Sequence, residues 1–230
     1  TDEVHFARGA NADGMYHEEY YCTNPLDCPP TPQPSPIEED DVYRHTTWGA
    51  FGADRAAHNG DYLLPTDTTT WPDFTADIAF VRMEAAADDL YVHIRFVSFP
   101  DPNAQIATFT FTSTTDTPNL TPWPRNAGIS SQHSHAVTLW GDGGEVVDAS
   151  GTASDLMAIG GAIHISEHAI EARIPLSALP TGIWNVSVGS GLADPADHTQ
   201  YWTVPMGAPT ATAPGTDANS APGSNVWDLA

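Results

Sequence analysis

Apolar and polar residues alternate along the chain, and the alternation is clearest between residues 78 and 97. One run has an apolar residue at every second position and reads Leu90-Tyr91-Val92-His93-Ile94-Arg95-Phe96. Side chains two positions apart share one face of a strand, so this run predicts a half-buried β-strand over 90–97. Residues 78–84 predict a second strand, and Asp88-Asp89 predicts the turn between the two. Together they predict an antiparallel hairpin.

Seven more short apolar runs predict further strands. They span 106–112, 135–140, 145–149, 162–165, 169–174, 184–192 and 201–204. Gly, Pro, Asn and Asp separate them at short intervals, and residues 175–179 predict a single helical turn. Short strands with frequent turn signals are typical of sandwiches and barrels. We therefore predict one all-β domain over 1–230, an antiparallel β-sandwich of the Ig-like or jelly-roll-like kind with long loops and little helix.

Two segments predict loops. Residues 22–41 are rich in proline and then acidic, which favours an inserted surface loop, because proline cannot serve in a central strand. Cys22 and Cys28 are the two cysteines of the chain, and their spacing predicts a disulfide that closes a short loop in an oxidising compartment. Residues 205–225 are rich in Ala, Pro, Gly, Thr and Ser and predict a loop or linker.

Charge excludes two classes of partner. The chain has 30 acidic residues against 7 basic ones, all of them arginine, for a formal net charge of −23. Nucleic acids and anionic membrane surfaces both require a basic surface on the protein, so neither is an expected partner. An acidic surface suits divalent cations and neutral ligands, and it also simply keeps a protein in solution.

The sequence contains no strong catalytic motif. No G-x-S-x-G element is present, and Ser131, His133, Ser134 and His135 are weak candidates in a chain with ten histidines. Among 30 carboxylates, pairs at glycosidase spacing are expected by chance. His133 and His135 would share one face of a strand, where exposed polar side chains are commoner than metal ligands. We therefore predict a module without catalytic residues.

Loop aspartates are candidate calcium ligands. Asn11 and Asp13 lie two positions apart in a loop flanked by glycines, and hard oxygen ligands in flexible loops suit calcium. A second candidate cluster precedes the first predicted strand and consists of Asp61, Asp67, Asp73 and Asp77. The ratio of 21 aspartates to 9 glutamates equally fits a loop-rich β protein that binds no metal, because aspartate favours turns.

Tryptophans carry the binding hypothesis. Trp71, Trp123 and Trp48 lie in predicted loops beside Pro, Gly or Thr, where an aromatic platform would be exposed. Sugar rings stack on such faces, while nearby polar groups bond the sugar hydroxyls. The alternative is that these side chains cover the ends of the sandwich. Trp140, Trp184 and Trp202 lie in predicted strands and are expected in the core.

Two stretches of the chain resemble known sandwich domains. The segment Asp73-Phe74-Thr75-Ala76-Asp77-Ile78-Ala79-Phe80-Val81-Arg82, with 88–96, resembles the hairpin of glucodextranase C-terminal-like and DOMON-like domains. Residues 170–179 are similar to the amphipathic strand, proline and short turn of that group, and 191–195 and 225–230 also resemble it. The likeness covers about 1–20 and 60–230, and the loop at 22–41 has no counterpart in it.

The resemblance is particularly to N-terminal accessory domains of large secreted actinobacterial hydrolases. It implies a secreted, non-catalytic module that binds carbohydrate or cell-wall glycan, holds calcium as family 9 carbohydrate-binding modules do, and adjoins downstream domains of the same chain. Apolar residues return at 226–230, which fits a chain that continues. Two alternatives stay open. One is a structural or protein-interaction domain with no small ligand, and the other is a haem-binding DOMON-type module with Met83 or Met157 and a His as axial ligands.

Overall fold

The predicted hairpin is present and forms the centre of one sheet. The computed structural model describes residues 62–72, 74–166, 168–216 and 224–229. Strand β2 (Ile78–Ala86) pairs antiparallel with β3 (Asp89–Phe96), with Met83 opposite Val92. The turn between them places Ala87 in the left-handed region at φ 52°. The alternation along 90–96 therefore predicted both the strand and its buried face.

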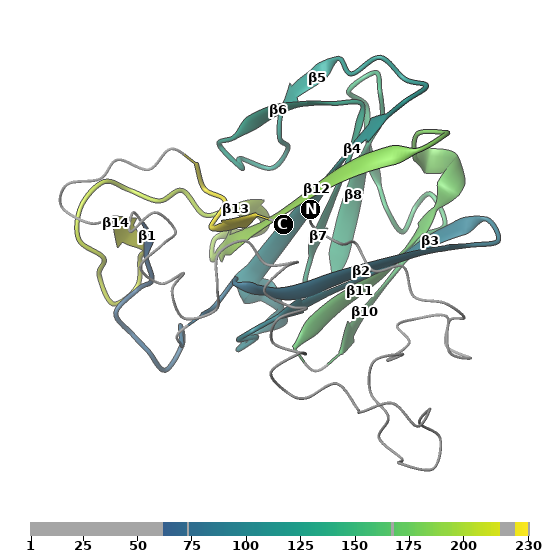
Figure 1. The fold of residues 1–230 in the computed structure, drawn as a ribbon. Coiled ribbons are helices and arrows are strands. Elements are labelled where there is room, and N and C mark those ends of the chain that lie inside the picture. Colours follow the sequence, from purple (N-terminus) through teal and green to yellow (C-terminus); the bar gives the residue numbers. More distant parts are fainter. Residues whose placement is uncertain (1–61, 73, 167, 217–223, 230) are drawn as a thin grey trace, which may run out of the picture.

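Two antiparallel sheets make up the sandwich. The smaller has the order β10-β11-β3-β2, where β10 is Ala162–Ser166 and β11 is Ala169–Pro175. The larger has the order β13-β12-β4-β7-β8-β9, with β15 pairing β12 beside that path. Its strands are β4 (Gln105–Ser113), β7 (His135–Trp140), β8 (Gly143–Val147), β9 (Ala153–Asp155), β12 (Trp184–Asp194), β13 (Asp197–Tyr201) and β15 (Asp228–Leu229). Figure 1 shows the two sheets facing each other.

Short elements connect these strands. Two small two-stranded sheets are β1 (Tyr62–Leu63) with β14 (Gly215–Thr216), and β5 (Leu120–Pro122) with β6 (Ser130–His133). The helical content of the described residues is two single 3-10 turns, η1 (Pro102–Ala104) and η2 (Leu176–Ala178). The second turn lies within 175–179, where the sequence predicts it. No helix in the described ranges is long and apolar enough to cross a membrane.

The main core lies between the two sheets. It is built from side chains on the inner faces of both, and it includes Val92 and Ile94 from β3 and Phe109 and Phe111 from β4, none of which is exposed. Burial of such side chains is the dominant favourable term in folding. The prediction of an all-β antiparallel sandwich with little helix is confirmed.

A second apolar cluster covers the other face of the larger sheet. Ile106 and Trp140 are register partners on that face, and Tyr201 and Val226 pack against them. The Tyr201 hydroxyl forms hydrogen bonds with Thr108 Oγ1 and with the Gly189 carbonyl, both at 3.0 Å. Burial raises the pKa of this phenol, because an ionised Tyr201 would lose its solvation. The larger sheet is thus covered on both faces near β13.

Two boundaries predicted near the C-terminus are wrong. The strand predicted at 201–204 ends instead at Tyr201, and it begins at Asp197. The segment 205–225 is not wholly a loop, since Gly215 and Thr216 pair with β1 and Asn225 is buried. Strands of two or three residues carry too little periodicity for detection, because their pairing depends on segments far along the chain.

Aspartates form the turns that their number predicts. Each of five aspartates accepts a backbone N–H from the residue two positions later, namely Asp67, Asp101, Asp148, Asp194 and Asp197. Hydroxyl donors from Thr70, Ser150 and Thr199 further lower the pKa of Asp67, Asp148 and Asp197. These carboxylates accept hydrogen bonds from donors in their own loops, as aspartate commonly does in turns.

Candidate functional site

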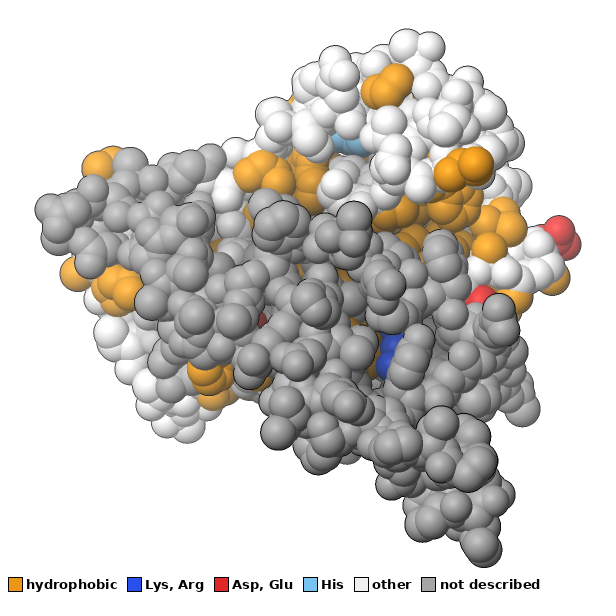
Figure 2. All heavy atoms as spheres, in the orientation of Figure 1, with side chains coloured by type: hydrophobic (Ala, Val, Ile, Leu, Met, Phe, Trp, Pro, Cys, Tyr) orange, Lys and Arg blue, Asp and Glu red, His pale blue; other side chains and the backbone are white. Residues whose placement is uncertain are grey.

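One end of the larger sheet carries a surface of uncharged hydroxyl and amide side chains. We define this hydroxyl-rich surface by Thr112, Thr114, Thr115, Thr117, Gln132, Thr181, Asn185 and Ser187. All are exposed except Thr112, which is half-buried. In Figure 2 the upper part of the molecule, over β4, β5, β6 and β12, shows uncharged polar and apolar side chains rather than acidic or basic ones. Such a surface is unusual in a chain with a net charge of −23.

Strand pairing brings these side chains together. Thr112 lies opposite Asn185, and Thr110 lies opposite Ser187, on the outer faces of β4 and β12. Phe109 and Phe111 alternate with these threonines and point into the core. Thr112 Oγ1 also donates to the Gln132 carbonyl of β6 at 3.2 Å. Residues 108–112 therefore carry a threonine-out, phenylalanine-in pattern, which is a signal visible in the sequence alone.

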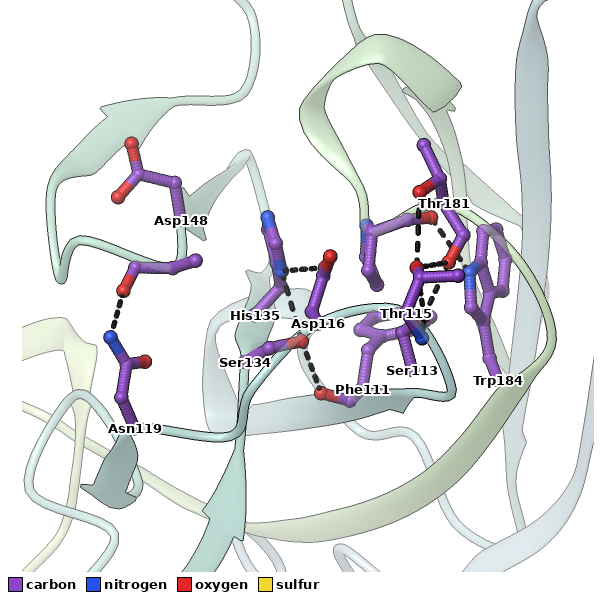
Figure 3. A network of polar contacts seen from close by, with 12 residues as sticks. Phe111, Ser113, Thr115, Asp116, Asn119, Ser134, His135, Asp148, Thr181 and Trp184 are labelled. Atoms are coloured by element: carbon purple, nitrogen blue, oxygen red, sulfur yellow. Dashed lines mark hydrogen bonds and ion pairs between the residues drawn. The ribbon is translucent and has the colours of Figure 1, made fainter.

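A network of hydroxyls anchors the rim of this surface (Figure 3). Thr115 Oγ1 donates to the Thr181 carbonyl at 2.7 Å, and the Thr115 N–H donates to Ser113 Oγ at 3.1 Å. Ser113 Oγ also donates to the Thr181 carbonyl. These contacts tie the loop after β4 to the loop before β12. Hydrogen bonds between these two loops consequently hold the rim in place.

Trp184 lies at the base of the same rim. Its indole Nε1 donates to the Pro180 carbonyl at 2.7 Å, and its ring meets Phe111 edge-on at 5.4 Å. The side chain is half-buried. The neighbouring Ile183 is 74% exposed, which is high for a large apolar side chain. The hydroxyls and amides of the outer face are therefore joined by an exposed aliphatic side chain, whereas the Trp184 ring packs on the core-facing side of β12.

The serine and histidine residues near this surface do not form a catalytic triad. A triad requires the serine at one ring nitrogen of the histidine and the carboxylate at the other. Here Ser134 Oγ lies 3.2 Å and Asp116 Oδ2 lies 3.9 Å from the same atom, His135 Nδ1. Ser134 Oγ is buried and also bonds the Phe111 carbonyl (Figure 3). This cluster offers no accessible nucleophile.

The electrostatics of His135 favour its neutral form. Burial lowers the pKa of His135, and the neighbouring His133 acts in the same direction. Asp116 and Asp148 oppose this shift but do not outweigh it. The Nδ1 atom of His133 bonds the Ser131 carbonyl at 2.8 Å, and the Nδ1 atom of His135 faces Asp116. The carboxylates that act on His135 are thus those of Asp116 and Asp148.

The exposure expected for two loop tryptophans is wrong. Trp123 is 5% exposed and Trp71 is 9% exposed. Trp123 packs in the cluster with Tyr201, and its Nε1 donates to Ser131 Oγ at 2.7 Å. Trp71 lies 5.4 Å from the Trp202 ring in a third apolar cluster. Both cover the sandwich, because distant segments fold over the loops that carry them. Trp48 lies outside the described residues.

Most candidate metal ligands and both cysteines lie outside the described residues. These are Asn11, Asp13, Asp61, Asp73, Cys22 and Cys28. Asp77 is described and is 8% exposed, with its carbonyl accepting the Val97 N–H at 2.9 Å. Asp67 turns inward to its own loop, as described above. Within the described ranges no three His, Cys, Asp or Glu side chains are arranged to hold a metal ion.

A second polar cluster crosses the outer face of the smaller sheet. Glu171 Oε1 accepts from His93 Nδ1 at 3.0 Å, and Glu171 Oε2 accepts from His164 Nδ1 at 2.9 Å. The three residues are register neighbours on β3, β11 and β10. Burial raises the pKa of Glu171, but the bonds from His93 and His164 outweigh it and hold that pKa below its ordinary value. His93 lies on the polar side of its strand, yet it is 8% exposed, and its ring stacks on Phe80 with 5.2 Å between the ring centroids.

The methionines do not favour the haem alternative. Met83 is 2% exposed and packs in the main core among aliphatic side chains from both sheets. It therefore faces no space in which a porphyrin could lie. Met157 is 50% exposed in the loop after β9. An axial methionine needs an apolar pocket around the ring that it ligates.

Comparison with known proteins leaves the family open. No family model matches the sequence. A search of the curated proteins likewise finds no match. The resemblance to glucodextranase C-terminal-like and DOMON-like domains is therefore a hypothesis about ancestry.

Proposed function

We propose that this chain is a non-catalytic, extracellular module that binds neutral carbohydrate on its hydroxyl-rich surface. One observation carries the proposal. In a strongly acidic molecule, a patch of exposed hydroxyl and amide groups lies beside the exposed side chain of Ile183 at the start of β12. Sugars present hydroxyl groups and apolar C–H faces, so they match both components. Trp71 and Trp123, being buried, have a structural role in this proposal.

The geometry of the surface suits extended polymers. Asn185 and Ser187 project from the same face of β12, two residues apart, and Thr112 lies across from Asn185 on β4. Side chains spaced along neighbouring strands form a row of donors and acceptors that can follow a glycan chain. Such a module, attached to downstream domains of a larger secreted hydrolase, would hold the enzyme near its polymer substrate.

Removing one amide and one hydroxyl group from the hydroxyl-rich surface should weaken carbohydrate binding without unfolding the protein. We expect the double variant Asn185→Ala, Ser187→Ala to lower affinity for the bound polysaccharide by about thirtyfold, because each neutral hydrogen bond contributes about 1 kcal/mol and two are lost. Affinity electrophoresis against a panel of neutral polysaccharides measures this. Thr212→Ala, an exposed threonine in the loop before β14, is the matched control and should migrate as the wild type. If no polysaccharide in the panel retards the wild-type protein, the proposal is wrong.

Calcium stabilisation is also part of the proposal. It rests on Asn11, Asp13, Asp61, Asp73 and Asp77, residues of the types that calcium prefers. An ion that binds the native state alone stabilises it by about 2.7 kcal/mol when its concentration is 100 times Kd. We expect chelation with EDTA to lower the melting temperature by several degrees and added calcium to restore it. An unchanged melting temperature in scanning calorimetry would remove calcium from the proposal.

A further inference from the structure

Among the strands that the structure describes, none pairs with one edge of β12 over half of its length. β12 pairs with β4 from Trp184 to Leu192. Its opposite edge pairs with β15 at Gly189 and Ser190 and with β13 at Ala193 and Asp194. In the part of the chain that the structure describes, residues 184–188 have β4 as their one partner strand. In Figure 1 this half of β12 lies beside β4 at the upper right, away from β13.

The register shows which backbone groups are available. The Thr114 N–H donates to the Ile183 carbonyl at 3.1 Å, so Ile183 directs its polar backbone groups at β4. In an antiparallel ladder this direction alternates, and Trp184, Val186 and Val188 therefore direct theirs to the open side. The alternation continues along β12. On the side away from β4, the Ser190 carbonyl accepts the Trp227 N–H at 2.7 Å, and the Leu192 carbonyl accepts the Trp202 N–H at 2.8 Å. Three residues thus present N–H and C=O groups to a further strand.

This edge carries none of the usual protection against pairing. Proteins blunt open edges with charged side chains, proline or a bulge. The segment Trp184-Asn185-Val186-Ser187-Val188 has no charge and no proline. The irregularity in β12 pairing lies at Ala193 and Asp194, outside the segment. Asn185, Ser187 and Ile183 are exposed around it, so an incoming strand can reach the edge.

We propose that a second copy of this chain adds its own β12 to this edge, antiparallel and centred on Val186. A two-fold axis then places Val186 opposite Val186 of the second copy. Trp184 faces Val188, and Asn185 faces Ser187. Aromatic with β-branched and amide with hydroxyl are favourable cross-strand pairs, and both recur twice by symmetry. The larger sheets of the two copies become one continuous sheet.

Charge is the reason for choosing a second copy as the occupant. Each copy carries −23, so two copies repel over most orientations, and the uncharged edge is where they approach at least cost. A basic partner would be recognised by acidic side chains, which this segment lacks. The association is consequently expected to strengthen as salt screens the remaining repulsion. Pairing through this edge depends on backbone geometry and charge and does not require carbohydrate binding.

Sedimentation velocity of the whole chain over a range of protein and NaCl concentrations tests the proposal. We expect a monomer–dimer equilibrium whose dissociation constant falls as NaCl rises from 0.05 to 1 M, by about tenfold. Calcium is held constant throughout, so that ion binding does not vary with salt. A wild-type chain that stays monomeric at every concentration in 1 M NaCl would overturn the inference.

Variants of β12 identify the edge and the register. Val186→Pro removes an N–H on the open side and none on the β4 side, and should weaken dimerisation by at least about thirtyfold. Ser187→Glu adds like charges without touching the backbone and should weaken it by about tenfold. Adding Asn185→Lys to Ser187→Glu should restore dimerisation, because positions 185 and 187 of the two copies face each other and then carry opposite charges. If one of the two variants folds poorly, the other still tests the edge. A folded Val186→Pro or Ser187→Glu protein that dimerises as tightly as the wild type would contradict the proposal.

Discussion

Replacing Trp123 with alanine is expected to lower the free energy of unfolding by about 3–5 kcal/mol, the usual cost of truncating a buried tryptophan. The side chain is 5% exposed and packs against Ile106, Trp140 and Tyr201. The change leaves a cavity on the outer face of the larger sheet. It also leaves Ser131 Oγ without its indole donor. Urea denaturation followed by fluorescence measures the difference.

Controls for this variant separate stability from binding. Ile183→Ala removes a large apolar side chain that is 74% exposed, and it should change stability by less than about 0.5 kcal/mol. Trp123→Phe keeps much of the volume and serves if the alanine variant does not accumulate. At temperatures where Trp123→Phe is folded, its retention by polysaccharide should equal that of the wild type. A folded Trp123→Ala protein with normal stability and lost binding would instead restore Trp123 as a ligand platform.

Removing Glu171 should cost about 3 kcal/mol at neutral pH, because hydrogen bonds to a charged group contribute about 1.5–3 kcal/mol each and a donor left buried loses more. The Glu171 carboxylate, 8% exposed, accepts hydrogen bonds from His93 and His164 on neighbouring strands, and Ser166 Oγ donates to it at 3.3 Å. We expect Glu171→Ala to show this loss in urea unfolding at pH 7.

The contribution of Glu171 should depend on pH with a defined sign. The pKa of Glu171 is lower in the folded protein than its ordinary value, because the two histidine bonds favour the ionised form over the effect of burial. Its stabilising effect is therefore complete above the ordinary glutamate pKa and is lost as pH falls through the lower, folded value. The difference between wild type and Glu171→Ala should shrink as pH falls into that acidic window.

An exposed ion pair on the same sheet supplies the comparison. Arg173 and Asp89 lie 3.2 Å apart with their side chains 38% and 21% exposed. Pairs in that setting contribute about 0–1 kcal/mol. Asp89→Ala should therefore change the free energy of unfolding very little, both at pH 7 and in the acidic range where Glu171 becomes protonated. A Glu171→Ala loss that stayed constant down to the most acidic pH would show that packing, rather than ionisation, accounts for it.

Patterns local in the sequence predicted much of the fold. The alternation over 90–96 defined β3 and its inner face, and the runs at 135–140 and 184–192 lie within or coincide with β7 and β12. Each of these strands is long enough for its period of two to be visible. The aspartates located turns for a reason that also acts locally, because their side chains bond backbone only two residues away.

The candidate site was much less predictable. Trp123 lies in a loop beside prolines, which favours exposure, but residues near 201 and 226 fold over it. His93 lies on the polar side of its strand, yet Glu171 from β11 and the Phe80 ring enclose it. Burial of such residues depends on which remote segments pack against them. No local pattern contains that information.

The sequence by itself determined that this protein is an acidic all-β sandwich in which strands face one core and aspartates form turns, because these features arise from neighbours along the chain. Only the tertiary structure decided which polar faces are covered and, among the described strands, which edge stays open. Thr112, Asn185 and Ser187 gather into one surface because β4 pairs with β12, which lies far later in the chain. The open half of β12 follows from where β15 and β13 end. Strand pairing over long separations sets both properties.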